Sequence, residues 1–153
     1  MLTTESRSRR ACRALAKLAL HANNWVKIEA AGGIECIATA MRSHPATSEL
    51  QNRPCFALRI LTRHADNLVK IEAAGGIGCI VTAMRSHPTN SELQHQVRFA
   101  LANLALHADI WVKIETLGGI ERIATAMRSH PTYSELQHQA CAALAFPVFH
   151  ADN

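Results

Sequence analysis

The sequence predicts an all-α fold in which helical units stack into a solenoid, and three observations support this prediction. A segment that reads HANNWVKIEAAGGIECIATAMRSHP from His21 returns from His64 and His107, at a spacing of 43 residues, and HADN opens a fourth copy at His150. Apolar residues inside each copy follow the 3.6-residue period of a helix. Gly-Gly and Ser-His-Pro divide each copy at fixed places. A period of this length is typical of helical arrays whose neighbouring units share one core.

The copies predict a single array over residues 1–153. Residues 1–20 are expected to form the third helix of a partial repeat, because ACRALAKLALH at Ala11 aligns with VRFALANLALH at Val97. Three full repeats follow at 21–63, 64–106 and 107–149. Residues 150–153 are the stub of a further repeat.

Each full repeat is expected to contain three helices, of which the first is short. In the first copy it covers NWVKIEAA and ends at Gly32-Gly33, because glycine enters the left-handed conformation of a helix C-cap without steric cost. The second helix carries apolar residues at i, i+3, i+4 and i+7 from Ile34 to Met41, which places them on one face. Ser-His-Pro ends it, because proline disfavours the α conformation in the residue before it.

The third helix is expected to open with a capping box. Ser-Glu-Leu-Gln begins at Ser48, Ser91 and Ser134, and a serine N-cap with glutamine three residues later satisfies two free N–H groups. The helix then runs for about four turns to the next histidine of the His21 series. Pro54 lies inside one third helix and is expected to kink or break it, and Pro147 interrupts the last one.

Composition agrees with a helical array inside the cell. The net charge of +4 comes from 16 basic and 12 acidic residues, which gives little support to nucleic-acid binding. No apolar run approaches the ~20 residues of a membrane span, so no membrane partner is expected. Five cysteines without a CxxC motif suggest a reducing compartment. We therefore expect a cytoplasmic or nuclear protein.

The repeat resembles the armadillo family over nearly the whole chain, from about Ser8 to Asn153. The resemblance is carried by AGGI at Ala31 and Ala74 and by SELQHQVRFALANLALH from Ser91. It implies a right-handed superhelix of three-helix repeats whose third helices line a concave groove. It also implies a non-enzymatic role in binding extended peptides or partner helices.

The resemblance also implies candidate binding residues on the third helices. In peptide-binding armadillo grooves a tryptophan and an asparagine one turn later recur. The tryptophan positions correspond here to Arg13, Phe56, Phe99 and Ala142, and the asparagine positions to Lys17, Ile60, Asn103 and Phe146. Only Asn103 keeps the residue type of the family, and Phe99 is an aromatic substitute.

The expected groove changes character along the array. Residues one turn before the tryptophan positions are Arg9, Asn52, His95 and His138. The inner face is therefore basic at its start and more apolar later, which suits a partner with an acidic end and an apolar end. The predicted contact set is Arg9, Arg13, Lys17, Asn52, Phe56, His95, Phe99 and Asn103.

The nine histidines do not suggest a metal site, and no cofactor is expected. Equivalent histidines in neighbouring repeats are separated by about one helix-packing distance of 8–10 Å, whereas zinc needs ligands at about 2.0–2.1 Å. Those at third-helix ends, such as His64, are expected to meet free carbonyls and the helix dipole. No phosphate loop, paired-carboxylate motif or nucleophile elbow is present, so no catalytic residue is expected.

The sequence thus predicts a protein-interaction scaffold that binds a peptide or helix along the concave third-helix face. One alternative is a nucleic-acid-binding helical repeat that uses the cluster from Arg7 to Lys17. Another is a hydrolase with a Cys–His pair such as Cys55 and His95. End-to-end self-association through exposed terminal faces is a further expectation.

Overall fold

The chain is all-helical over the part that the structure describes. The computed structural model describes residues 3–129 together with residues 131, 132, 134, 137, 138, 141 and 145. These residues form α-helices and one short 3-10 turn, without a strand. The elements are α1 (Thr4–Ala19), η1 (Ala22–Asn24), α2 (Trp25–Ala30), α3 (Gly33–Ser43), α4 (Ser48–Leu61), α5 (Ala65–Ala73), α6 (Gly76–Ser86), α7 (Ser91–Ala105), α8 (Ala108–Thr116) and α9 (Gly119–Ser129).

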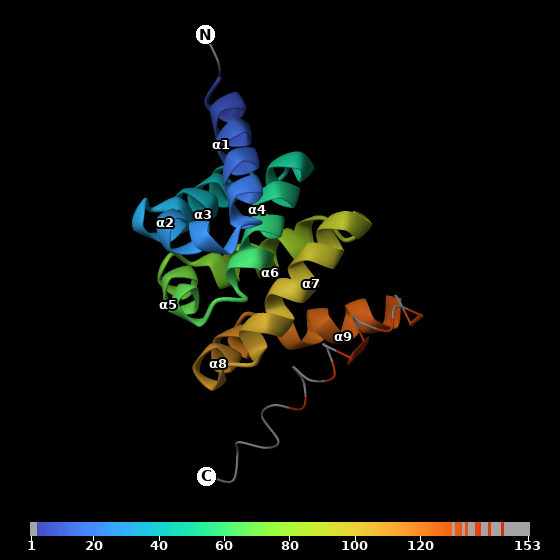
Figure 1. The fold of residues 1–153 in the computed structure, drawn as a ribbon. Coiled ribbons are helices and arrows are strands. Elements are labelled where there is room, and N and C mark those ends of the chain that lie inside the picture. The colour runs from blue at the N-terminus through green and yellow to red at the C-terminus, as the bar shows by residue number, and fades with distance from the viewer. Residues whose placement is uncertain are drawn as a thin grey trace.

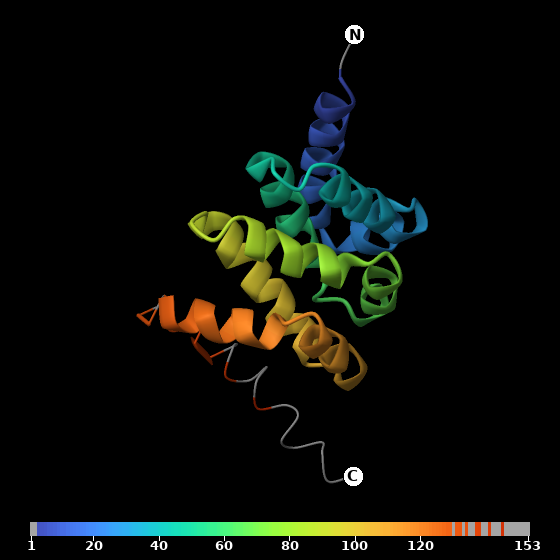
Figure 2. The ribbon, with the colours of Figure 1, turned by 180° about the vertical axis from the view of Figure 1, so that it is seen from behind.

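Helices that occupy the same place in successive repeats lie side by side. The third helices α1, α4 and α7 follow one another along one row (Figure 1). The second helices α3, α6 and α9 form another row, seen from behind in Figure 2. The short first helices stand at one edge, where α2 contacts α5. The prediction of an all-α fold is therefore confirmed for the described residues.

The Gly-Gly pairs serve two different purposes. The first glycine of each pair has the left-handed conformation that the sequence predicts, with φ of 70° at Gly32, 74° at Gly75 and 73° at Gly118. The second glycine is needed for space. A Cβ atom on Gly76 would lie 2.7 Å from Ile71 Cγ2 and 2.9 Å from Ile71 O. Any larger residue there would push the first helix away from the second.

The predicted apolar stripe of the second helices forms the core. Ile37 and Ile80 have no exposed surface, and Ile123 is also buried. The third helices pack against this stripe through leucines such as Leu58 and Leu101, which are fully buried. Burial of this kind contributes about 1.5–3 kcal/mol for each large aliphatic side chain, so the stripe is the main source of stability.

The predicted capping box is wrong. Ser48 and Ser91 are the first residues inside their helices, and the N-cap residues are Thr47 and Asn90. The Asn90 side chain accepts a hydrogen bond from Leu93 N at 3.0 Å. The cap therefore lies one residue earlier than expected, and the glutamine of the Ser-Glu-Leu-Gln motif is free for another contact.

That glutamine joins the third helix to the end of the second. Gln94 Nε2 donates to Met84 O at 2.7 Å and to His87 O at 2.9 Å. Met84 O has no helical N–H four residues ahead, because residue 88 is a proline. The glutamine supplies the missing donor. The same contact recurs from Gln51 to Met41 O and from Gln137 to Met127 O.

The predicted break at Pro54 does not occur. Helix α4 runs without interruption from Ser48 to Leu61, with the ring of Pro54 buried. Proline lacks the N–H that would bond to Leu50 O, so the helix loses one hydrogen bond but is held in place by packing on both sides. Pro147 lies outside the described residues, as do Ala142, Phe146, most of the third helix predicted after Ser134, and the stub at 150–153.

In the part of the chain that the structure describes, the side chains of His21, His64 and His107 do not have the predicted contact with a helix-terminal carbonyl. The His64 ring packs edge-on against the Trp25 ring, with centroids 5.5 Å apart. Terminal carbonyls of the third helices are met by other side chains. Trp25 Nε1 donates to Ala19 O at 2.6 Å, and Asn67 Nδ2 donates to Leu61 O at 3.2 Å.

Candidate partner-binding face

The predicted contact residues lie on three neighbouring third helices. We call the side of α1, α4 and α7 that carries them the third-helix face. Helix α1 carries Arg9, Arg13 and Lys17, helix α4 carries Asn52 and Phe56, and helix α7 carries His95, Phe99 and Asn103. Their environments differ, and they fall into a stacked centre, a paired arginine and an open basic pocket.

The centre of the face is an arginine between two phenylalanines. The Arg59 guanidinium carbon lies 5.6 Å from the ring centre of Phe56 and 5.4 Å from that of Phe99. Arg59 Nη1 also donates to Gln96 Oε1 at 3.1 Å. Since Phe56 belongs to α4 and Phe99 to α7, the stack joins two repeats. Cation–π contacts of this kind are worth about 0.5–1 kcal/mol each at exposed sites.

Arg59 is absent from the sequence-based contact set. The signal that points to it is a departure from the repeat, since the equivalent residues are Ala16 and Ala102. His95 continues the stack on the far side, with its ring centre 4.7 Å from that of Phe99. His95 and Phe99 are both half-buried, so they contribute to packing and still present an edge to solvent.

Asn103 faces its neighbouring helix. Its Nδ2 donates to Thr62 Oγ1 at 3.1 Å and lies 3.5 Å from Arg59 O. Both amide hydrogens are therefore used at the end of α4, and the amide oxygen alone is left to meet a ligand. A residue that clamps a peptide backbone needs a donor as well as an acceptor. Asn103 thus contributes more to joining α4 and α7 than the sequence suggests.

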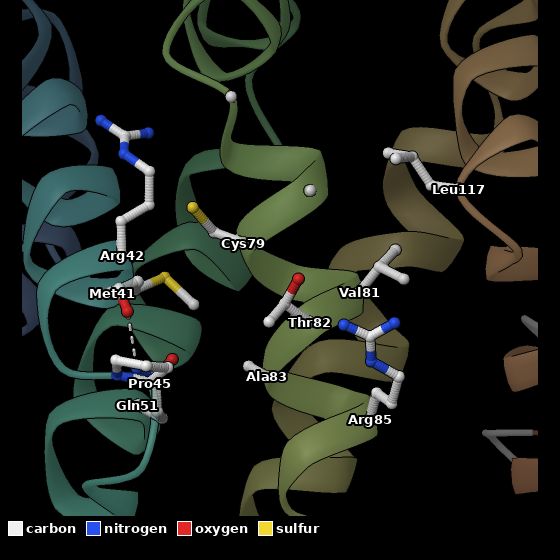
Figure 3. Close-up of a pocket in the computed structure, with 12 residues that line it drawn as sticks. Met41, Arg42, Pro45, Gln51, Cys79, Val81, Thr82, Ala83, Arg85 and Leu117 are labelled. Carbon is white, nitrogen blue, oxygen red and sulfur yellow. Dashed lines mark hydrogen bonds between the residues drawn. The ribbon is translucent and has the colours of Figure 1, made fainter.

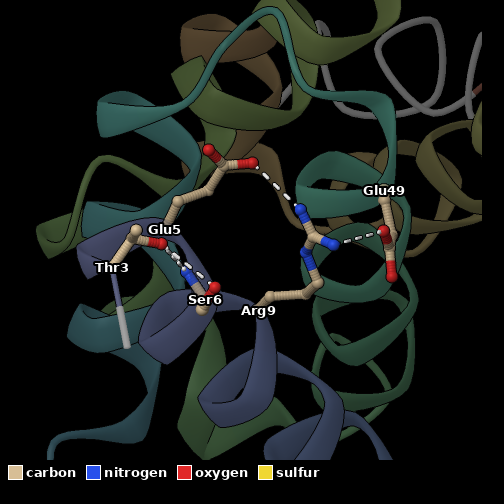
Figure 4. A network of polar contacts seen from close by, with 5 residues as sticks. All are labelled: Thr3, Glu5, Ser6, Arg9 and Glu49. Atoms are coloured by element: carbon tan, nitrogen blue, oxygen red, sulfur yellow. Dashed lines mark hydrogen bonds and ion pairs between the residues drawn. The ribbon is translucent and has the colours of Figure 1, made fainter. Parts of the chain in front are cut away.

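The positive charge of Arg9 is already paired with carboxylates of the chain. Its guanidinium lies between two carboxylates, with Nη2 3.0 Å from Glu5 Oε1 and Nη1 3.2 Å from Glu49 Oε2 (Figure 4). Glu49 belongs to α4, so this pair joins the first two third helices. Asn52 lies one turn along α4, half-buried, and its Oδ1 has no hydrogen-bond partner among the described residues.

An open basic pocket lies between α1 and α4. Its volume is about 160 Å³, and its lining consists of Arg13, Ala16, Lys17, Leu20, Arg53 and Phe56. The three cations are exposed, and within the described part of the chain none of them has an ion pair or hydrogen bond. Arg53 lies outside the predicted contact set, whose positions on each third helix are one turn apart.

A larger pocket lies on the other side of the molecule, between α3 and α6. It has a volume of about 580 Å³ and is lined by Met41, Cys79, Val81 and Thr82, with Leu117 at its far side (Figure 3). The repeat pattern does not predict this pocket. Gly78, which stands where the other repeats have Glu35 and Glu121, is part of the lining, and a Cβ at residue 78 would meet nothing within 4 Å.

The three buried thiols, Cys12, Cys55 and Cys79, have the properties of packed side chains, whereas Cys36 and Cys141 are exposed. Cys55 is fully buried, and burial raises its pKa, which is the opposite of what a nucleophilic thiolate needs. Burial, with a smaller effect of Cys36, raises the pKa of Cys12 to about 11. The proposed pairing of Cys55 with His95 therefore lacks an activated nucleophile. In the described residues no group of three or more His, Cys, Asp or Glu side chains is placed to hold a metal ion.

Among the described helices none is by itself long and apolar enough to cross a bilayer. Helices Ala65–Ala73 and Gly76–Ser86, which meet at a bend of 75°, reach the required length and composition only as a pair.

Comparison with known proteins supports the helical fold and gives no information about activity. No family model matches the chain, and no curated protein matches it. A crystal structure of an engineered protein is similar, with a TM-score of 0.75 and 33% sequence identity. The alignment covers 94% of this chain and 57% of the engineered chain, so this chain spans a little over half the length of the engineered protein.

Proposed function

We propose that this chain is a non-enzymatic binding scaffold of the armadillo type. In this proposal the repeats form a right-handed superhelix, and the third-helix face is the concave groove that receives a partner peptide or helix. The side-by-side rows of equivalent helices and the left-handed glycine at each first-helix end support the armadillo assignment.

One observation carries the binding role. The third-helix face presents a continuous strip of cationic and aromatic groups drawn from three repeats, which runs from the basic pocket through the Phe56–Arg59–Phe99 stack to His95. Arginine and aromatic residues are the types enriched at the centres of protein interfaces. A partner that lies across the three helices would contact all of them at once.

A peptide display library panned on the whole chain tests the proposal. Enriched peptides should lose affinity by about tenfold or more when Phe99→Ser removes one side of the stack, because hot-spot aromatic residues typically cost 2 kcal/mol or more on truncation. The melting temperature of the variant is measured in parallel to separate lost binding from lost folding.

The matched control lies on the first helices. Val26, Val69 and Val112 form an equivalent row of exposed apolar side chains, of which Val69 is 68% exposed. Val69→Ser should leave binding unchanged. If instead Val69→Ser abolishes binding while Phe99→Ser does not, the first-helix edge is the binding surface and the proposal is wrong. A library that yields no peptide competed by the soluble chain also refutes it.

A further inference from the structure

The basic pocket marks a place where the third-helix face departs from its own repeat. Between α4 and α7, Arg59 occupies the space between the rings of Phe56 and Phe99. The equivalent residue between α1 and α4 is Ala16, and there the space stays open as the pocket of about 160 Å³. The same position is therefore filled by an arginine in one junction and left open in the preceding one.

The polarity of the two junctions is reversed. In the filled junction the arginine donates a hydrogen bond to Gln96, which acts as an acceptor. In the open junction the residue equivalent to Gln96 is Arg53, which is a donor only. A group that enters the open pocket must therefore accept hydrogen bonds. Arg13 and Lys17 surround the same space with two more donors.

The three pocket cations differ from Arg9, Lys70 and Lys113, each of which faces a carboxylate. Arg9 is paired with Glu5 and Glu49. In the same way, Lys70 Nζ lies 3.2 Å from Glu29 Oε1, and Lys113 Nζ lies 2.9 Å from Glu72 Oε1. The pocket lining contains no carboxylate. Three like charges that share one cavity repel one another, and this repulsion is relieved when an anion lies between them.

We propose that this pocket binds the carboxylate of an aspartate or glutamate side chain in a peptide that crosses the third-helix face. A carboxylate is planar and accepts two parallel N–H bonds from a guanidinium, so Arg53 and Arg13 suit it. The cavity is several times the roughly 30 Å³ of one water, which suits the end of one acidic side chain. The neighbouring peptide residue then contacts Phe56. This inference rests on the proposed function and adds the chemistry of its ligand.

Two substitutions test the pocket with residues that the repeat already carries. Arg13→Phe copies Phe56 and Phe99 of the next two third helices, and Arg53→Gln copies Gln96. Because each residue is present at the equivalent position of another repeat, both variants are expected to keep the fold, which circular dichroism and the melting curve check. Arg85→Gln, an exposed arginine on α6 away from this face, is the matched control.

The probes are a fluorescently labelled peptide selected from the display library on the full chain, and the same peptide with its carboxylates replaced by carboxamides. We expect the selected peptides to be enriched in aspartate or glutamate. Arg53→Gln and Arg13→Phe should each weaken the acidic peptide by roughly tenfold or more, because each removes a guanidinium that donates charge-assisted hydrogen bonds to the carboxylate. The carboxamide peptide should change by less than about twofold, and Arg85→Gln should affect neither.

Other outcomes overturn the inference in distinguishable ways. If the selected peptides show no preference for acidic residues, the pocket does not bind a carboxylate. The same conclusion follows if the two substitutions weaken the acidic peptide and its carboxamide form equally. Either result leaves the proposed function standing. A library without enriched peptides refutes the proposed function, and the pocket with it. If a single-stranded DNA oligonucleotide displaces the acidic peptide and its own affinity falls steeply with log salt, the cations bind phosphates and the proposal is wrong.

Discussion

The glutamine between the second and third helices allows a quantitative test of how each repeat is held together. Gln94 is 7% exposed and donates two hydrogen bonds, to Met84 O at 2.7 Å and to His87 O at 2.9 Å. Pro88 has no N–H to offer Met84 O, so the glutamine is the replacement donor. His87 O keeps a second donor, Asn90 N at 3.2 Å.

The substitution Gln94→Leu removes both bonds while keeping a side chain of similar size. Met84 O is left as a buried acceptor without this donor, and His87 O loses one of its two bonds. A buried unsatisfied acceptor costs about 1–3 kcal/mol and a lost net hydrogen bond about 1 kcal/mol, so we expect a loss of roughly 2–4 kcal/mol in the free energy of unfolding. Urea denaturation followed by far-ultraviolet circular dichroism measures it.

Gln94→Glu adds a pH dependence of known sign. The introduced carboxylate would face two carbonyl oxygens in a buried place, which raises its pKa in the folded state above the unfolded value of about 4.3. The variant should therefore be less stable than the wild type at neutral pH. The difference should shrink as pH falls toward about 4.3, because the protonated acid can donate one hydrogen bond.

Gln137 provides a graded control. It donates to Met127 O at 2.9 Å in the last repeat but is only half-buried, so water can replace part of the lost bond. Gln137→Leu should cost less than Gln94→Leu. A loss below about 0.5 kcal/mol for Gln94→Leu, the range of ordinary surface changes, would refute the idea that this contact stabilises the repeat.

Three further predictions concern packing and ionisation. Ile80→Ala should cost about 2–5 kcal/mol in urea denaturation, since Ile80 is fully buried in the central repeat, and a loss near zero would place it on the wrong face. Pro54→Ala should stabilise the chain by up to about 3 kcal/mol, because it restores an N–H inside α4; a lower melting temperature would show that the buried ring matters more. Stability should decline as pH rises above 9.0, because the buried thiols of Cys12 and Cys55 ionise in the unfolded chain first, and Cys12→Ala should remove the part of this decline that ends near pH 11.

Periodicity predicts the features of this fold that depend on local backbone geometry and on which face of a helix is apolar. The left-handed Gly32, Gly75 and Gly118 and the buried Ile37 and Ile80 lie where the sequence places them. These features follow from short-range steric rules and from one repeating hydrophobic pattern, both of which are visible in a single sequence.

Contacts between helices were not visible in the same way. The Ser-Glu-Leu-Gln motif is compatible with a capping box, but its glutamine donates to a carbonyl ten residues earlier, on another helix. The local pattern contains no information about that carbonyl. Arg9 was likewise predicted as part of a basic surface, yet the carboxylate of Glu49 on the next third helix neutralises it. Charge pairing across a helix junction depends on register, which the sequence alone does not define.

The repeat itself separates structural rows from candidate recognition positions. Rows that are copied without change contain contacts between neighbouring repeats. Lys70 reaches Glu29, and Lys113 reaches Glu72 in the same way one repeat later. Such identity follows from duplication and from the need to stack, so it identifies no ligand. Residues on the third-helix face change from copy to copy, as Ala16 becomes Arg59 and Arg53 becomes Gln96.

At the α1–α4 and α4–α7 junctions two of these exchanges occur together. Where position 59 supplies a donor, position 96 supplies the acceptor, and where position 16 leaves space, position 53 supplies a donor to whatever enters. A ligand that accepts hydrogen bonds needs donors at its site, and the α1–α4 junction supplies them. Binding by this chain is therefore best tested at this junction, and not at the rows of lysine and glutamate that are copied from repeat to repeat.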